Sequence, residues 1–328
     1  VEDQQDPVRR LPVHWALGQV LFHRGQFVPA LAQVEHGLTL YSPDLHQTRA
    51  LQDSGVMCFA YAALTRLCLG YPDHALQTAQ QMLTLARTLG HRFSLAFALN
   101  IAATVSLIRR DWQHATTLGM EALELCQEQG FPVWLAYAQI LVGWLGVRQG
   151  RGEEHLAQML QGVSAWQATG AEASRTFLLS LVAGAYERSG QPIRGLQILE
   201  DALALTQTNE EQYCLAELWR LKGALTLQRE TRDWRLETGS LSSQASSLKP
   251  QASSEAEACF LKALEIARNQ QAKGWELRAS LSLGRLWAQQ GKHQEAQQLV
   301  SAILVWFTEG FDTADVREAQ RFLATRST

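Results

Sequence analysis

The chain has 328 residues, of which 46% are hydrophobic and 19% are charged. Its apolar stretches are interrupted by Gln, Arg or Gly well before the roughly 18 residues that a membrane-spanning helix needs, so we expect no membrane segment. The formal net charge of -3 gives no overall positive field, so we expect no direct binding to nucleic acid or to an anionic membrane surface.

The cysteines and histidines give no indication of a metal site. The five cysteines are odd in number, form no C-x-x-C pair and lie in apolar runs, so we expect reduced thiols in the core. The nine histidines include no H-E-x-x-H motif, and His23, His74, His114 and His293 lie beside predicted turns, where solvated imidazoles are expected. The first residues lack the pattern of a signal peptide, which predicts a cytoplasmic protein.

In chain order, the sequence repeats a unit of two helices around a turn. The predicted turns are at Gly25, Gly70, Arg110, Gly150, Gly190 and Gly291, and they are evenly spaced from Gly70 to Gly190. Seven residues before each turn stands a small residue: Gly18, Ala63, Ala103, Gly143, Ala183 and Gly284. A small side chain is needed where two helices cross closely, so these positions predict the crossing points of antiparallel pairs.

Within each unit the apolar residues recur at three and four positions, which is the helical period. The segment from Phe59 to Leu67 is an example, and Pro72, Pro132 and Pro192 fall at predicted turns or helix starts, where a missing N–H is tolerated. Five residues after the turns the residues are mainly Ala or Gly, but His155 occupies this column in the fourth unit. We expect its helix to be displaced or its packing to be looser.

The polar, Ser-rich segment 229–254 interrupts the sixth pair. We predict a flexible inserted loop between its two helices, with the repeat resuming at Glu255. The whole chain, residues 1–328, would still form a single domain because an insertion at a turn leaves the stacked core intact.

These observations predict an all-α fold, an α-α superhelix of about seven antiparallel helix pairs. The pattern resembles the tetratricopeptide repeat, as in Ala256-x-x-x-Phe260-x-x-Ala263 and in the segment from Trp219 to Gly223. The units between Gly70 and Gly190 are longer than the usual repeat of about 34 residues, which implies longer helices. The alternative is a helical bundle without translational repetition.

Several strings resemble the C-terminal repeat region of large bacterial signalling proteins, in which an AAA-type ATPase module, often preceded by a class III adenylate or guanylate cyclase domain or a DNA-binding domain, is followed by tetratricopeptide repeats. The strings are Tyr41–His46, Leu69–Leu76, Gln129–Trp134, Ala165–Gly170, Gln270–Arg278 and Trp306–Asp315. The resemblance implies that the chain is a sensor arm whose partners include upstream domains of the same polypeptide, and that any ATPase or cyclase activity lies in those domains.

No catalytic or cofactor motif is evident. A nucleotide-binding G-x-x-x-x-G-K-[ST] loop is missing, since Gly291-Lys292 lacks both the upstream Gly and the following hydroxyl residue. Ser, Cys and carboxylate residues show no arrangement of a nucleophile with its base. We therefore expect no enzyme activity and no cofactor in this chain.

The candidate site is a surface for a protein or peptide on the inner face of the superhelix, which the first helix of each pair would line. Counting back from the turns gives the predicted partner-binding residues Trp15, Phe97, Asn100, Tyr137, Trp144, Arg148, Phe177, Arg188, Arg220 and Arg285, and the same counting places Phe22, Met57, Leu64 and Arg278 on this face. Aromatic anchors and Arg–carboxylate pairs could hold an extended or helical peptide. Alternatively the aromatic residues are core, the arginines are solvated helix ends, or an apolar pocket inside the superhelix binds a small-molecule effector.

Overall fold

The computed structural model describes residues 6–43, 51–150, 152–238 and 250–324, and these residues form helices and turns without strands. The prediction of an all-α superhelix is confirmed. The helices are α1 (Pro7–His23), α2 (Phe27–Leu40), α3 (Ser54–Leu69), α4 (Pro72–Leu89), α5 (Arg92–Ile108), α6 (Trp112–Gln129), α7 (Pro132–Arg148), α8 (Gly152–Ala168), α9 (Arg175–Arg188), α10 (Pro192–Thr208), α11 (Leu215–Thr238), α12 (Pro250–Asn269), α13 (Lys273–Gln289), α14 (His293–Leu304) and α15 (Ala314–Ala324).

Left-handed residues end the helices at regular intervals. All six predicted turn residues have a positive φ, from 65° at Arg110 to 93° at Gly70. A second series, Gly90, Gly130, Gly170 and Glu210, separates one pair from the next and also has a positive φ. From Gly70 to Glu210 the two series alternate, so a left-handed residue recurs at one constant interval, and this spacing fixes the length of each helix.

Small residues lie at the helix crossings, as predicted. A Cβ on Gly18 would come within 2.4 Å of Val34 on the partner helix, and one on Gly143 within 2.8 Å of the His155 carbonyl oxygen. The exceptional His155 is accommodated by Gly146, whose missing Cβ leaves the space that the imidazole occupies. The compensation for the large side chain is therefore a glycine on the facing helix.

The prediction for residues 229–254 was wrong at both ends of the segment. Residues 229–238 continue α11 and residues 250–254 begin α12, while residues 239–249 lie outside the described residues. Arg229 reaches Glu255 of α12 at 3.8 Å, and Arg232 donates to the carbonyl of Gly190 at 3.3 Å. These contacts hold the polar extension of α11 against its neighbours, so its composition does not prevent a helix.

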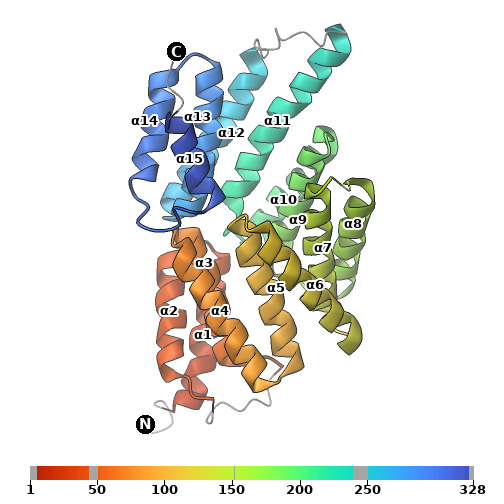
Figure 1. The fold of residues 1–328 in the computed structure, drawn as a ribbon, viewed down its shortest axis with the longest axis vertical. Helices are drawn as coiled ribbons and strands as arrows, with labels where there is room; N and C mark the ends of the chain where they lie inside the picture. Colours follow the sequence, from red (N-terminus) through yellow and green to blue (C-terminus); the bar gives the residue numbers. More distant parts are fainter. Residues whose placement is uncertain (1–5, 44–50, 151, 239–249, 325–328) are drawn as a thin grey trace.

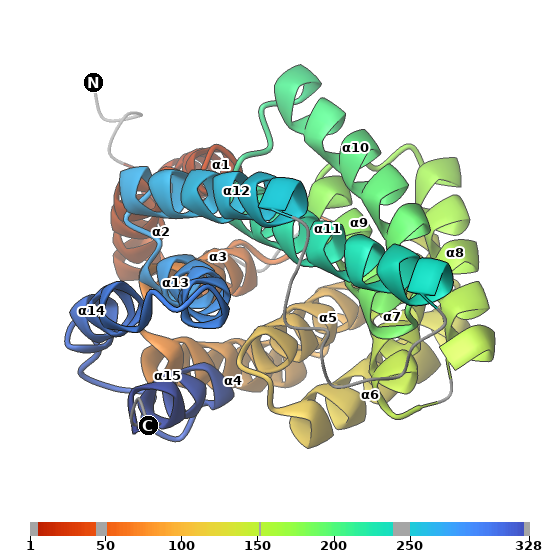
Figure 2. The same cartoon turned by 90° about the horizontal axis from the view of Figure 1, so that it is seen from above.

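The superhelix curves until its last helices lie over its first ones. In Figure 1 α11–α15 form the upper part of the molecule above α1–α6, and in Figure 2 α13 lies over α3, which it contacts. The turn before α13 packs closely on α3, because a Cβ on Gly274 would come within 2.9 Å of the Leu67 carbonyl oxygen. The inner face is therefore enclosed by both halves of the chain.

The segment between α14 and α15 closes the superhelix on α4 and α5. The Glu309 carboxylate accepts hydrogen bonds from the backbone N–H groups of Asp73 and His74 at 2.8 and 3.1 Å, at the N-terminus of α4. The Asp73 carboxylate in turn accepts from the N–H of Gly310 at 2.8 Å and from Arg109 at 3.0 Å. These hydrogen bonds join the segment before α15 to α4 and to the end of α5, although the two regions are distant in the sequence.

Candidate binding cavities on the inner face

The inner face contains two adjoining cavities, which we call the aromatic cavity and the arginine cavity. The aromatic cavity has a volume of about 100 Å³ and the arginine cavity about 360 Å³. Ile108, Phe177 and Trp275 line both, so these side chains form the wall between the two. The cavities differ in chemistry, as the following contacts show.

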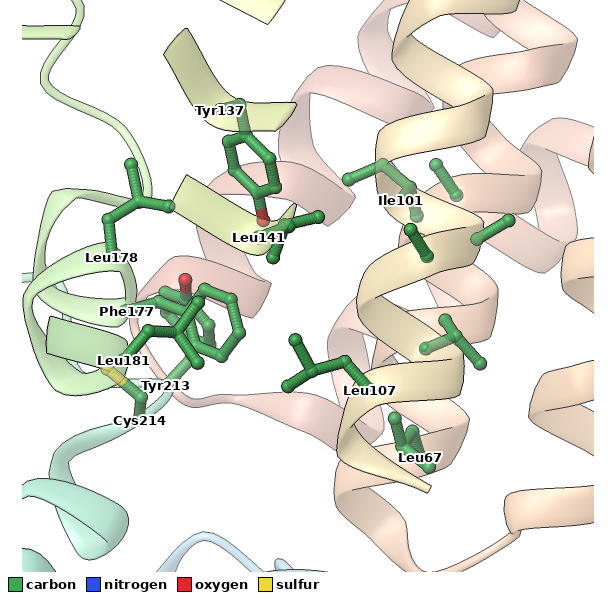
Figure 3. Packing of buried hydrophobic residues seen from close by; sticks show 14 of the residues in the cluster. Leu67, Ile101, Leu107, Tyr137, Leu141, Phe177, Leu178, Leu181, Tyr213 and Cys214 are labelled. Carbon is green, nitrogen blue, oxygen red and sulfur yellow. The ribbon is translucent and has the colours of Figure 1, made fainter. Parts of the chain in front are cut away.

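The aromatic cavity is enclosed mainly by side chains from the first helices of the pairs, with Trp166 of α8 and Tyr213 from the segment before α11. In Figure 3 Tyr137, Phe177 and Tyr213 lie on one side, facing Ile101 of α5, and all four line this cavity. Further lining residues are Phe22, Met57, Tyr61, Phe97, Thr104, Trp134, Trp166 and Trp275. The aromatic side chains named here are buried, apart from the half-buried Trp134, so the alternative that the aromatic residues belong to the core holds for Phe97 and Phe177.

A buried carboxylate lies beside the aromatic cavity and is fully used by the fold. Glu211 is only 3% exposed and pairs with His23 at 3.2 Å. It also accepts hydrogen bonds from the N–H of Ser174 and from the N–H and hydroxyl of Thr176. Burial alone would raise the pKa of Glu211, but His23 and Thr176 outweigh it and lower the pKa. The expectation of a solvated imidazole was wrong for His23.

The arginine cavity collects charged side chains from five helices and one turn. Six arginines line it, namely Arg110, Arg148, Arg188, Arg220, Arg278 and Arg285, together with four carboxylates, Glu187, Glu217, Asp315 and Glu318. The lining therefore carries an excess of two positive charges when all groups are ionised. Burial raises the pKa of Glu187, and the neighbouring Glu217 raises it further, while Arg220 and Arg188 oppose the shift.

Four of these arginines are paired with carboxylates of the same cavity. Arg110 binds Asp315 at 3.0 Å and Glu318 at 2.7 Å, and these two carboxylates belong to α15. Arg278 also binds Asp315, at 2.7 Å, and Arg285 also binds Glu318, at 3.0 Å. The fourth, Arg220, makes two hydrogen bonds of 2.8 Å to Glu217 on its own helix. The ion pairs thus connect α15 to α13 and to the turn between α5 and α6.

Arg148 and Arg188 differ from the other four, because neither has a carboxylate partner within the described part of the chain. The guanidinium of Arg148 lies 3.8 Å from the ring centroid of Trp112, whose ring is 5.3 Å from that of Trp144. Burial lowers the pKa of Arg148, and the nearby charges of Arg188 and Arg110 lower it further. Arg148 is half-buried and Arg188 is exposed, so two cations without a carboxylate partner stand at the wall of the cavity.

The structure brings eight of the ten predicted partner-binding residues to these cavities. Phe97 and Tyr137 line the aromatic cavity; Trp144, Arg148, Arg188, Arg220 and Arg285 line the arginine cavity; Phe177 lines both. Trp15 is half-buried on α1 and lines neither. Asn100 is fully buried and donates to the carbonyls of Ala96 and Trp134, so its side chain is used within the packing of α5 on α7. We leave these last two out of the candidate site.

Residues outside the predicted set complete the arginine cavity. Arg110 is itself the turn residue, and Trp112 begins the second helix, so neither falls at a position that counting back from the turn selects. One signal in the sequence could have identified Arg110, because it is the arginine in a column of glycines. In the structure it keeps a positive φ of 65°, a conformation that a non-glycine residue adopts at a cost. Asp315 and Glu318 could not be assigned, because α15 reaches the cavity only through the curvature of the superhelix.

Comparison with known proteins identifies the fold and no family. No family model matches the chain, and no curated protein has a significant match to it. A Rap protein complexed with Competence and Sporulation Factor has a TM-score of 0.59 and 12% identity, covering 98% of this chain and 77% of that chain. Aspartyl phosphate phosphatase F from Bacillus subtilis has a TM-score of 0.55 and 9% identity, with 96% and 74% coverage. The apo form of RapI has a TM-score of 0.52 and 10% identity, with 96% and 99% coverage.

These similarities and the regular left-handed turns define the class of the protein as a tetratricopeptide-like helical solenoid. At this level of identity the similarity extends to the fold alone. None of the helices in the described ranges has the length and apolarity to span a bilayer. Function must therefore be argued from the cavities.

Proposed function

We propose that the chain is a non-catalytic protein-interaction scaffold that binds an acidic segment of a partner protein in the arginine cavity. The observation that carries the proposal is the pair Arg148 and Arg188, which has no carboxylate partner among the described residues although the other four arginines of the cavity do. A ligand carboxylate placed between them would remove the repulsion between two cations. It would also replace lost hydration with charge-assisted hydrogen bonds.

The shape of the cavity suits a side chain or a short peptide segment. Its volume of about 360 Å³ is within the range of roughly 300–1,000 Å³ that is usual for ligand pockets. Trp112 and Trp144 provide a flat apolar wall on which Arg148 is held, so its guanidinium is already oriented before a ligand arrives. One of the similar structures is a complex of a Rap protein with Competence and Sporulation Factor, and that complex supports a binding role for this fold.

The non-catalytic part of the proposal rests on the sequence, which has no nucleotide-binding loop and no nucleophile with an evident base. One of the similar structures is an aspartyl phosphate phosphatase, so phosphatase activity is the enzyme activity to test first. Release of inorganic phosphate from a phospho-aspartyl protein by the purified chain would contradict this part of the proposal.

Binding is best tested with a labelled peptide of alternating Glu and Leu residues and its counterpart in which Gln replaces every Glu. Fluorescence anisotropy should show at least about tenfold tighter binding of the acidic peptide, since about 1.4 kcal/mol corresponds to a tenfold change in affinity. The double variant Arg148→Glu and Arg188→Glu should lose this preference. The matched control is Arg92→Glu, which reverses the charge of an exposed arginine away from both cavities. Equal binding of the two peptides would contradict the proposal.

The finer proposal is that the chain is the C-terminal sensor arm of a larger bacterial ATPase or nucleotide-cyclase signalling protein in the cytoplasm. It is supported by the resemblance of strings such as Trp306–Asp315 to the repeat region of those proteins. The acidic segment would then belong either to an upstream domain of the same polypeptide or to a separate protein. Sequencing the complete gene tests this proposal, and a reading frame without an ATPase or cyclase domain would contradict it.

The alternative function is a receptor for a small-molecule effector, and the aromatic cavity is the observation that favours it. Its lining includes Trp134 and Trp166, whose buried indole N–H groups have no hydrogen-bond partner among the described residues. A small apolar molecule with an acceptor atom would satisfy them. Thr104→Leu should partly fill this cavity, so it should weaken small-molecule binding while leaving the acidic peptide bound. Small-molecule binding that is unchanged in this variant would contradict the alternative.

A further inference from the structure

An apolar stripe on α1 is exposed to solvent. Val13, Leu17 and Val20 are 62%, 43% and 53% exposed, and their spacing of four and three residues places them on one face of the helix. Single exposed apolar side chains are normal on a protein surface, whereas three in one stripe indicate a contact surface. This face is distinct from the inner face with its two cavities, so the inference is independent of the proposed function.

The repeat shows what this face does elsewhere in the molecule. Val13, Leu17 and Val20 stand twelve, eight and five positions before the turn residue Gly25. At the same distances before Gly70, α3 has Cys58, Ala62 and Thr65, and all three are 0% exposed. The equivalent side chains of α5, α7, α9 and α13 are buried as well, apart from one that is half-buried. The face is therefore the interface between successive hairpins.

Its partner in the other hairpins is the second helix of the preceding pair. Gly37 of α2 lies against Cys58 of α3, where a Cβ on the glycine would come within 2.9 Å of the sulfur. Gly119 of α6 lies against Val142 of α7 in the same way, at 3.2 Å. In both cases a glycine allows the covering helix to approach closely. The exposure of the stripe on α1 shows that no described helix covers it.

We propose that the stripe on α1 is a docking surface for a helix hairpin of the same repeat class, whose second helix covers α1 as α2 covers α3. The covering helix carries Gly or Ala where it crosses Val13 and Leu17, because these side chains are larger than their equivalents on α3. Arg9 and Arg24 lie on the same face at the two ends of the stripe, with side chains 64% and 50% exposed.

The charges at the two ends of the stripe are already compensated, because Arg9 pairs with Asp6 at 3.9 Å and Arg24 pairs with Glu210. The equivalent interfaces of the other hairpins, in which the second helix of the preceding pair covers this face, identify the occupant as another hairpin.

The register of the repeat provides a probe for the surface. Pro7 begins α1 and Pro132 begins α7, and the two prolines stand at the same distance before their turn residues, Gly25 and Gly150. A fusion in which residues 91–131 are duplicated directly before Pro7 therefore places the α5–α6 hairpin ahead of α1 in the spacing it has ahead of α7. The measurement is hydrogen exchange of the α1 amides, with far-UV circular dichroism to follow the added hairpin.

The expected result is that α1 amides exchange at least about tenfold more slowly in the fusion than in the unfused chain, since covering a helix raises the free energy of its local opening. Leu17→Glu should abolish this protection. Val305→Glu, which places the same charge at an 84% exposed site outside the stripe, should leave it intact. Unchanged exchange in α1, or an added hairpin that stays unfolded, would overturn the proposal. A dimer of the unfused chain that Leu17→Glu dissociates would overturn it too, and would assign the stripe to a second copy.

Discussion

The two cavities differ in how the fold pairs the charged side chains beside them. Beside the aromatic cavity, the Glu211 carboxylate is matched by His23 and by three N–H and O–H donors from residues 174–176. In the arginine cavity, Arg148 and Arg188 are left without a carboxylate in the described chain, and burial together with neighbouring cations lowers the pKa of Arg148. A charged group that has partners within the fold contributes to stability. A charged group without such a partner is available to bind a ligand.

The largest expected effect on stability is at Glu211, the carboxylate whose hydrogen bonds are all made within the fold. Replacing Glu211 by Ala leaves buried donors of Ser174 and Thr176 without an acceptor, so we expect the free energy of unfolding to fall by about 3–5 kcal/mol. The neighbouring Glu210 is 64% exposed and pairs with Arg24 on the surface, so Glu210→Ala should cost less than about 1 kcal/mol. Urea unfolding of both variants tests the difference, and equal losses would mean that Glu211 does not hold the two halves of the chain together.

The same carboxylate predicts a dependence on pH. Because the net effect on Glu211 is a lowered pKa, its charged form stabilises the folded protein above its ordinary pKa of 4.5. This contribution is lost as the pH falls through the lower, folded-state value. The Glu211→Ala variant should therefore lose less stability than the wild type when both are unfolded at successively lower pH below 4.5.

An intermediate effect is expected where α15 closes the arginine cavity. Burial raises the pKa of Glu318, but its hydrogen bonds to Arg110 and Arg285 outweigh burial and lower the pKa to about 2. Glu318→Gln should cost about 1–2 kcal/mol at pH 7, where the charged hydrogen bonds are complete. The difference from the wild type should shrink as the pH falls from 4.5 towards 2, because the wild-type carboxylate then becomes neutral.

Denaturant unfolding at several pH values checks this effect. Glu295→Gln is the matched control, since it removes an exposed carboxylate of α14 that lies outside both cavities. A pH-independent difference for Glu318→Gln would show that the side chain acts by packing and not by its charge. The ion pairs of Glu318 with Arg110 and Arg285 would then not contribute to holding α15 against the arginine cavity.

The regular part of the fold was predictable from the sequence, and the site only in part. Gly70, Gly150 and Gly190 mark turns because only a residue without Cβ adopts a positive φ at no steric cost, and such residues stand out in a sequence. The helical extension at 229–238 was missed because its Ser-rich continuation obscured it. The alternating charges of Arg229, Glu230 and Arg232 are typical of an exposed helix and could have indicated it.

The closure of the superhelix was not predictable in the same way. It depends on a small rotation between neighbouring hairpins that accumulates along the chain, and no single residue encodes that rotation. The contacts that result, such as Arg110 with Asp315, join residues whose separation carries no periodic signal. Counting positions back from each turn could therefore place Arg148 and Arg188 on the inner face, but could not show that the fold leaves them without partners.

The smallest expected effect on stability is at Arg148. This substitution also tests most directly whether a charged group without a partner in the fold serves binding. No described carboxylate pairs with Arg148, and Arg188 and Arg110 repel it, so the main loss in Arg148→Gln is the contact with the Trp112 ring, and the free energy of unfolding should fall by less than about 1 kcal/mol. Arg220→Gln is the matched control on the same cavity wall. It removes a half-buried guanidinium bound to Glu217 by two hydrogen bonds and should cost more than about 2 kcal/mol.

Thermal or urea unfolding of the two variants, followed by titration with the acidic peptide, separates structural from binding arginines. Arg148→Gln should fold normally and bind the peptide at least about tenfold more weakly, because the ligand loses a charged partner that the fold did not use. If Arg148→Gln destabilised the protein as much as Arg220→Gln, both arginines would belong to the fold. The excess positive charge of the cavity would then be a cost of packing that no ligand is needed to explain.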